Sequence, residues 1–214
     1  LCTELGGDIE DHFVNFERTP VAAASLAQVH RARLAGSGQD VAVKIQYPGL
    51  EALVAGDLAS IRFISRLLSW VFPYLSLDWM VREFRVNLAK ELDFVQEAES
   101  AERTRAFFAD DRRIAVPRIF QQQSTRRVLT MEYIDGIRVD DVDMLVKAGI
   151  DPSDVAKEVV DAFGKMVFVS GFVHCDGHSG NMPVRSRSQQ RGDFELFLLD
   201  HGLYRELDEK FRKA

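Results

Sequence analysis

Two polar segments near the carboxyl end of the chain restrict its fold and its chemistry more than any other part. The first is Gly171–Asn181, GFVHCDGHSGN, which contains Asp176 and, five residues later, Asn181. The second is the apolar run LFLLDHG, in which Asp200 follows the apolar residues. These oxygen donors predict two adjacent loops that hold the magnesium ion of a nucleotide. In such a site one Asp orients the attacking oxygen, while the Asn and the other Asp hold the magnesium ion.

The same segments also offer ligands for a transition metal. Imidazole and thiolate groups suit zinc, and four such residues are present: His174, Cys175, His178 and His201. Their spacing matches none of the common zinc patterns, and three of the four are neighbours on one loop. We therefore expect a magnesium site with oxygen ligands rather than a zinc site.

Composition excludes several classes of protein. The chain has 214 residues, 46% of them hydrophobic, which is enough for one domain or two small lobes. Its formal net charge of −6 argues against a protein that binds nucleic acid by neutralising phosphates. With Cys2 and Cys175 as its two cysteines, it has no disulfide framework. Its apolar runs are shorter than the about 20 residues that span a bilayer. No leader is recognisable at Leu1, so we interpret the chain as an excised piece.

Periodicity predicts a lead-in helix followed by an antiparallel sheet. A weak helical pattern covers Glu4–Arg18 and ends before a proline. The runs Leu26–Leu34 and Asp40–Tyr47 flank a Gly-Ser-Gly turn and predict a β-hairpin. Two further strands are expected over Ile114–Phe120 and Arg127–Tyr133, separated by a polar turn.

Helical patterns fill most of the remaining chain. Apolar residues recur with a period near 3.6, and a proline or glycine commonly marks the end of a run. The predicted helices are Leu50–Phe72, Leu77–Phe108, Val142–Ala148 and Pro152–Ser170. Asp151 is the expected N-cap of the last helix, with Pro152 in its first turn.

Three segments of the first half suggest a nucleotide site. The small residues Ala22, Ala23, Ala24 and Ser25 let backbone approach a ligand closely, as glycines do in loops that cradle phosphates. Lys44 lies in the otherwise apolar run VAVKIQ, where an amine needs a carboxylate or phosphate partner. Glu97, beside Ala98 and Ala101, is the candidate carboxylate. The alternatives are that Lys44 extends to the surface and that Glu97 belongs to a solvated helix face.

The segment LTMEYIDG supplies a possible grip for a base. Its extended part, Met131, Glu132, Tyr133 and Ile134, offers free backbone N–H and C=O groups to an adenine edge.

The order of these segments resembles the protein-kinase-like fold. More narrowly, PVAAASLAQVHRA, VAVKIQYPG, KELDFVQEA, GFVHCDGHSGN and LLDHG are similar to the UbiB family, also called aarF-domain-containing or ADCK kinases. The resemblance covers nearly the whole chain and implies a two-lobed α+β fold. We expect a lead-in helix over 1–18, an N-lobe with a five-stranded antiparallel sheet over 19–134, and a partial helical C-lobe over 135–214.

The resemblance also implies an activity and a setting. It points to an atypical kinase-like ATPase that binds ATP with Mg²⁺. The family is membrane-associated and supports ubiquinone or other isoprenoid-lipid metabolism, which implies a mitochondrial or plastid location. An isoprenoid lipid or a membrane surface is therefore an expected partner, contacted through parts outside this chain.

Single residues take roles by the same resemblance. Ala22 to Ser25 take the role of the nucleotide loop, and Lys44, paired with Glu97, that of the phosphate-binding lysine. Glu91 and Asp93 correspond to the E-x-D pair, and Met131 to Ile134 to the hinge. Asp176 corresponds to the catalytic Asp, and Asn181 and Asp200 to the metal ligands. His178 occupies a position where ordinary protein kinases have a lysine that steadies the phosphoryl group. The charge of a histidine depends on pH near neutrality, and the alternative role is a hydrogen bond to the loop backbone.

Departures from the family pattern leave other functions open. Gly177 and Ser179 replace prolines, Pro183 replaces an apolar strand residue, and we expect these changes to loosen the loop. The K-x-G-Q segment and most of the C-lobe helices are missing. A small-molecule kinase of the antibiotic-phosphotransferase kind is disfavoured by the Ala-rich loop and the E-x-D helix. A nucleotide-binding pseudokinase scaffold is favoured by the loop departures and opposed by the retained Lys44, Asp176, Asn181 and Asp200. Protein-kinase activity on Ser or Thr has least support, because no APE-like segment follows Asp200.

Overall fold

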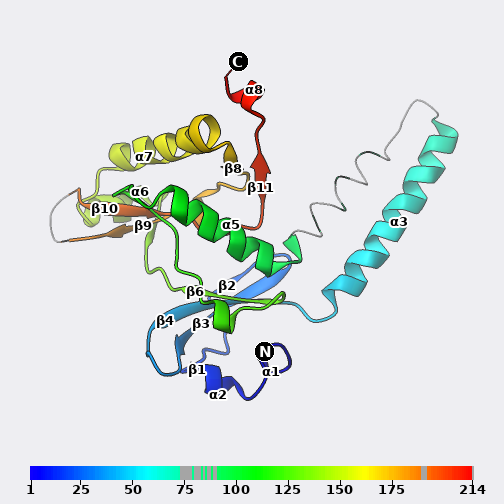
Figure 1. The fold of residues 1–214 in the computed structure, drawn as a ribbon, viewed down its shortest axis with the longest axis horizontal. Helices are drawn as coiled ribbons and strands as arrows, with labels where there is room; N and C mark the ends of the chain where they lie inside the picture. The colour runs from blue at the N-terminus through cyan, green and yellow to red at the C-terminus, as the bar shows by residue number, and fades with distance from the viewer. Residues whose placement is uncertain are drawn as a thin grey trace.

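The amino-terminal part of the chain forms one antiparallel sheet (Figure 1). The structure is a computed structural model that describes residues 1–72, 79, 83, 85, 88, 91–188 and 192–213. Strands β3 (Ala27–Leu34) and β4 (Asp40–Gln46) form a long hairpin, and β6 (Val128–Glu132) pairs with β4. The short strands β1 (Phe13–Val14) and β2 (Ala22–Ala23) both pair with β3. The predicted hairpin and the strand near 127–133 are confirmed.

The side chains of β4 point alternately to the two faces of the sheet, and these faces differ. Side chains two residues apart in a strand point to the same side. Val41 and Val43 are fully buried in an apolar cluster that includes Phe13. Lys44 and Gln46 therefore lie on the opposite face, where both contact the region of helix α5 (Phe94–Phe107).

The predicted lead-in helix over Glu4–Arg18 is wrong. The segment contains two short helices, α1 (Cys2–Leu5) and α2 (Ile9–His12), before strand β1 begins at Phe13. Gly6 and Gly7 separate the helices with φ angles of 73° and 78°, in the left-handed region. A right-handed helix cannot continue through these conformations, and glycine adopts them at little cost.

The predicted strand Ile114–Phe120 is also wrong as a continuous strand. Its first residues form β5 (Ile114–Ala115), which pairs in parallel with β10 (Phe194–Phe197) in a second sheet. Ile119 makes an isolated bridge to Met131 of the first sheet. Pro117 lies between the two pairings, has no N–H to donate and restricts the backbone. The sheet does have five strands, but β1 and β2 complete it.

The two long helices of the first half differ in their packing. Helix α3 (Leu50–Val71) confirms the predicted helix, and Figure 1 shows it projecting away from the sheets. Several of its apolar side chains are exposed, among them Phe63 and Trp70. The continuous helix predicted over Leu77–Phe108 is interrupted at Asp93, which has extended backbone. The part before Glu91 lies mostly outside the described residues.

The carboxyl-terminal part combines helices with two small sheets. Helices α6 (Val142–Lys147) and α7 (Pro152–Gly164) confirm the predictions, and α7 continues as a π-helix, η2 (Lys165–Ser170). The four-stranded sheet has the order β5-β10-β9-β7. The remaining elements of this part are β7 (Ile137–Arg138), β8 (Phe172–His174), the 3-10 helix η3 (Ser179–Asn181), β9 (Pro183–Ser186), β11 (Tyr204–Glu206) and α8 (Glu209–Arg212). Strands β8 and β11 pair with each other.

A large apolar core joins α5 to this carboxyl-terminal part. It includes Phe94 and Ala98 of α5, Leu145 of α6 and Leu196 of β10, all of them buried. In the described part of the chain, no helix is long and apolar enough to cross a membrane. Pro183 begins β9, a position in a strand where proline is tolerated.

Candidate functional site

The start of α5 is held against β4, and this contact decides where Glu97 lies. Gln46 Nε2, on the same face of β4 as Lys44, donates a hydrogen bond to the Leu92 carbonyl at 2.8 Å. Glu97 follows about one turn into the helix, and its side chain is 4% exposed. The predicted contact is confirmed, because Lys44 Nζ donates to Glu97 Oε1 at 2.8 Å and to Oε2 at 2.9 Å.

Lys44 also donates to Asp200 Oδ1 at 3.0 Å, so one ammonium group links two carboxylates. We call Lys44, Glu97 and Asp200 the charge cluster. Burial acts to lower the pKa of Lys44, but the charges of Glu97 and Asp200 outweigh it and raise the pKa. Burial acts to raise the pKa of Asp200, and the charge of Lys44 overcomes it and lowers the pKa. For Glu97 burial dominates, and the pKa is raised although Lys44 opposes it.

Asp200 lies in the connection between β10 and β11, and its backbone is unusual. Its φ angle of 56° lies in the left-handed region, which few residues other than glycine adopt. Leu199 N donates to the Asn181 carbonyl at 2.8 Å, and His174 Nε2 donates to the Leu199 carbonyl at 3.0 Å. These bonds stabilise the strained conformation and join it to residues 174–181, which we call the polar loop.

The polar loop is shaped mostly by its own hydrogen bonds. Asp176 N donates to His174 Nδ1, and Asn181 Nδ2 donates to the Asp176 carbonyl, each at 3.1 Å. The amide oxygen of Asn181 is the remaining acceptor of that side chain. The Asp176 carboxylate is about half exposed, with Oδ2 at 4.0 Å from His178 Nε2. His178 Nδ1 accepts from Gly180 N at 3.1 Å, which is the backbone role considered for this histidine.

A group of three side chains fastens the polar loop to the segment after β7. Ser179 Oγ donates to Asp140 Oδ2 at 2.7 Å, and Arg138 Nη2 donates to Ser179 Oγ at 3.0 Å. Arg138 also binds both carboxylate oxygens of Asp140, and these bonds hold the pKa of Asp140 far below its ordinary value. We call Arg138, Asp140 and Ser179 the loop clamp. At Gly177, a Cβ would lie 2.3 Å from Phe163 Cζ, so glycine allows close packing there. These contacts oppose the expectation that Gly177 and Ser179 loosen the loop.

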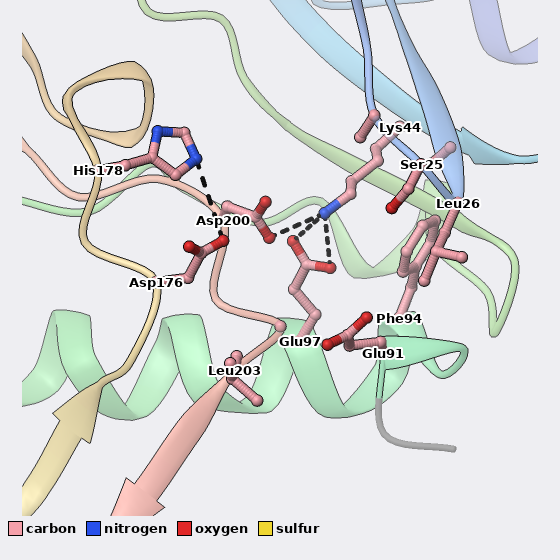
Figure 2. Close-up of a pocket in the computed structure, with 13 residues that line it drawn as sticks. Ser25, Leu26, Lys44, Glu91, Phe94, Glu97, Asp176, His178, Asp200 and Leu203 are labelled. Carbon is pink, nitrogen blue, oxygen red and sulfur yellow. Dashed lines mark hydrogen bonds and ion pairs between the residues drawn. The ribbon is translucent and has the colours of Figure 1, made fainter. Parts of the chain in front are cut away.

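The charge cluster and the polar loop meet at one cavity of about 210 Å³ (Figure 2). Its lining residues are Ala24, Ser25, Leu26, Ala27, Lys44, Glu91, Phe94, Glu97, Asp176, His178, Asp200, Gly202 and Leu203. The carboxylate of Glu91 lies near those of Asp176 and Asp200. Burial, together with the charges of Asp200 and Asp176, raises the pKa of Glu91. The cavity is smaller than the about 300–1,000 Å³ of pockets that enclose drug-sized ligands, so it matches part of a nucleotide.

Other predicted site residues lie beside this cavity rather than in its lining. Ala22 and Ala23 form β2 and pair with β3, whereas Ala24 and Ser25 line the cavity. The expected hinge residues, Met131, Glu132, Tyr133 and Ile134, lie at the end of β6 and just after it. None of these four is among the described residues that line the cavity.

The two residues of the E-x-D pair have different positions. Glu91 faces the cavity, but Asp93 is the N-cap of α5. Asp93 Oδ1 accepts from Val95 N at 3.1 Å, and Arg126 lies 3.7 Å from the other carboxylate oxygen. Asp93 therefore acts locally by satisfying the first turn of the helix.

The zinc alternative is not supported. His174 and His201 use their ring nitrogens in hydrogen bonds within the protein. Among the residues that the structure describes, no three His, Cys, Asp or Glu side chains are grouped so that they could hold a metal ion. Burial and the neighbouring His174 also lower the pKa of His201 to about 4.

A family model for the ABC1 atypical kinase-like domain matches residues 1–214. The chain belongs to this family. AarF domain-containing protein kinase 1 of Gallus gallus is 42% identical over 209 residues, which are 98% of this chain and 40% of that protein. A probable serine/threonine-protein kinase, abkB of Dictyostelium discoideum, is 39% identical over 212 residues, or 98% of this chain and 31% of that protein. The two-lobed kinase-like fold predicted from the sequence is thereby confirmed.

A solved structure supports the same assignment of fold. The complex of Rv3197 with erythromycin from Mycobacterium tuberculosis aligns with a TM-score of 0.73 and 26% identity. The alignment covers 96% of this chain and 50% of that protein. This ABC1 chain thus spans between about a third and a half of the proteins that it matches.

Sequence reasoning missed several residues that shape the site. Phe94 packs its ring 5.2 Å from Lys44 Nζ, in a cation–π arrangement, and Leu203 lines the cavity. Arg138 and Asp140 of the loop clamp were also missed. The one local feature of the sequence that could have indicated these two residues is an arginine followed two residues later by an aspartate. This pattern is too common to be informative.

Proposed function

We propose that this ABC1 domain binds ATP with magnesium and transfers or hydrolyses its γ-phosphoryl group. The observation that carries the proposal is the charge cluster, in which Lys44 contacts Glu97 and Asp200 and all three residues line the cavity. In this arrangement a lysine is held ready for phosphate next to a carboxylate suited to a metal ion. Homologues named as kinases support the same class of function.

The chemistry of the donor set suits magnesium, with Asp200 in the lining of the cavity and Asn181 buried beside it rather than in the lining. Asp200 offers a carboxylate, and Asn181 offers an amide oxygen while its Nδ2 is engaged with the Asp176 carbonyl. Magnesium prefers such hard oxygen ligands and completes its coordination with water and substrate phosphates. When bound, the ion would supply charge neutralisation for the phosphates, and Asp200 and Asn181 would hold it.

The chain's own residues suit the remaining requirements of phosphoryl transfer. Ala24 and Ser25 line the cavity, and their backbone would cradle the phosphates. Asp176 would accept the proton of the attacking hydroxyl or water. The new bond joins that oxygen to the γ-phosphorus, while the bond to the bridging oxygen breaks and ADP leaves with the electron pair.

The acceptor and the setting rest on the family resemblance. We propose an isoprenoid-lipid context, such as ubiquinone metabolism at a membrane surface, and place the contacts with lipid outside this chain. A nucleotide-binding scaffold without turnover is the second candidate. It is favoured by Lys44 donating to Asp200, because this bond occupies one oxygen, Oδ1, of the carboxylate that a metal ion needs.

A binding and turnover assay separates the two candidates. In the full-length protein, ATP binding is measured by thermal shift with and without Mg²⁺, and phosphate release is measured with and without isoprenoid-lipid vesicles. We expect Mg²⁺-dependent binding and release that Asp176→Asn reduces strongly. The exposed Asp154 provides the matched control, as Asp154→Asn should behave like the parent. Binding without release supports the scaffold, and absence of binding overturns both.

A further inference from the structure

A chain of hydrogen bonds, partly buried at Tyr204 and buried at Leu198, connects α5 to the residue after Asp200. Thr104 Oγ1 of α5 lies 3.1 Å from the Tyr204 hydroxyl, which lies 2.8 Å from His201 Nδ1. His201 Nε2 lies 2.9 Å from the Leu198 carbonyl. Thr104 and His201 are 3% and 4% exposed, so water cannot easily replace these partners.

The proton positions along this chain follow from its ends. A carbonyl only accepts, so His201 Nε2 carries the proton and donates to Leu198. In the neutral ring Nδ1 is then an acceptor, and the Tyr204 hydroxyl donates to it. The Tyr204 oxygen in turn accepts from Thr104, whose single hydroxyl proton is shared with the Ser100 carbonyl, 2.8 Å from Thr104 Oγ1. The order of donors is therefore Thr104, Tyr204 and His201.

The position of Thr104 relates this chain to the charge cluster. Glu97 and Thr104 are seven residues apart, close to two helical turns, so they lie on the same side of α5. Near the start of α5, Glu97 is linked to Asp200 through Lys44. About two turns later, Thr104 contacts Tyr204, which is four residues after Asp200. Two separate contacts thus fix α5 relative to the segment that carries Asp200.

Apolar contacts hold the Tyr204 ring independently of its hydroxyl. The ring stacks on Phe172 at 4.3 Å between centroids and on His201 at 5.7 Å. The Arg103 guanidinium lies 3.9 Å from the centroid of Phe172 and also binds Glu206. Removing the hydroxyl alone therefore leaves the ring packed, which allows a clean test.

We propose that Thr104 and Tyr204 are positioning residues that hold α5 in register with the Asp200 segment through His201. The hydrogen bonds keep Glu97 and Asp200 at the distances at which both reach Lys44. Their consequence for turnover rests on the proposed phosphoryl-transfer function. The hydrogen bonds themselves can be tested without nucleotide.

The first test uses variants that remove or keep one hydroxyl. In the full-length protein, Tyr204→Phe and Thr104→Val should each lower kcat about threefold to tenfold, the effect of losing one buried hydrogen bond, while KM for ATP changes less. Thr104→Ser keeps the hydroxyl and should restore parental kcat. The double variant should lose little more than either single variant, because both interrupt one chain. Tyr47→Phe, outside the cavity lining, is the control.

The second test detects the hydrogen bond in nucleotide-free protein. The Nδ1 resonance of His201, assigned by its loss in His201→Asn, should shift in Tyr204→Phe and remain in place in Tyr47→Phe. If the parent protein shows no ATP turnover but this shift of the resonance is seen, the proposed function fails. The positioning role of Thr104 and Tyr204 then stands. An unchanged Nδ1 resonance in Tyr204→Phe overturns the inference. So does a Thr104→Ser variant as impaired as Thr104→Val.

Discussion

The charge cluster and the polar loop form two sides of one cavity, but different kinds of contact hold them. Lys44 meets Glu97 and Asp200 across 53 and 156 residues of sequence, and the side chains of Lys44 and Glu97 are nearly buried. The polar loop is shaped by bonds between near neighbours and fastened by the exposed loop clamp. One side depends on tertiary packing, and the other depends mainly on local structure.

This difference predicts how each side responds to change. In the charge cluster, removal of Lys44 leaves the carboxylate of Glu97 buried without compensation, which is costly, whereas Asp200 is 36% exposed. In the polar loop, water can replace a lost partner, because Asp176, His178 and the loop clamp are partly exposed. We therefore expect large effects in the cluster and small ones in the loop.

Loss of Lys44 should have the largest effect on stability. Lys44→Met should destabilise the protein by about 3 kcal/mol, the usual result of breaking a buried ion pair by removing one partner. Urea unfolding measures this, and Lys44→Met/Glu97→Gln should lose much less than the sum of the single variants. A loss below about 1 kcal/mol would contradict burial of the cluster.

Asp200→Asn should remove the response to magnesium. Asparagine tolerates the left-handed backbone of this position, so the fold should survive and the loss should be one of charge. We expect that at least about ten times more Mg²⁺ is needed to produce the same thermal shift with nucleotide. Asp140→Asn in the loop clamp is the comparison and should keep the shift. If the two variants respond alike, the cluster has no special role in metal binding.

Glu91 tests the electrostatic contact between the two sides. Its folded-state pKa is raised above 4.5, so its contribution to stability is present below pH 4.5 and is lost as pH rises through the folded-state pKa. At neutral pH the ionised group destabilises the protein without metal. Glu91→Gln should therefore raise Tm at pH 7 and leave it unchanged near pH 4. The gain should stay below about 1 kcal/mol, because the side chain is partly exposed. Added Mg²⁺ should reduce it, and an equal gain at both pH values would contradict this account.

The smallest effect should follow from opening the loop clamp. Ser179→Ala removes the hydroxyl that contacts Asp140 and Arg138, and we expect a loss of about 0.5 kcal/mol in the free energy of unfolding. Chemical denaturation measures it, with Ser153→Ala, at an exposed position of α7, as the control. A loss as large as that of Lys44→Met would remove the distinction between the two sides.

Much of the fold and part of the site followed from the amino-acid sequence, because the signals were local. Alternation predicted the β3–β4 hairpin, and Asp151 with Pro152 predicted the start of α7, where Asp151 accepts from Ser153 N. The cost of burying an amine predicted that Lys44 needs a carboxylate or phosphate partner, and its position beside Ala98 and Ala101 made Glu97 the candidate carboxylate.

Only the tertiary structure decided the remaining features. Asp93 is two residues from Glu91, yet a break in the helix makes one a cap and leaves the other in the cavity. Thr104 and Tyr204 are 100 residues apart, and no local pattern relates them. Propensity and periodicity act over a few residues, whereas these contacts depend on how separate elements pack. The sequence therefore determined many of the elements and which charges need partners, whereas packing determined where some elements break and which distant side chains meet.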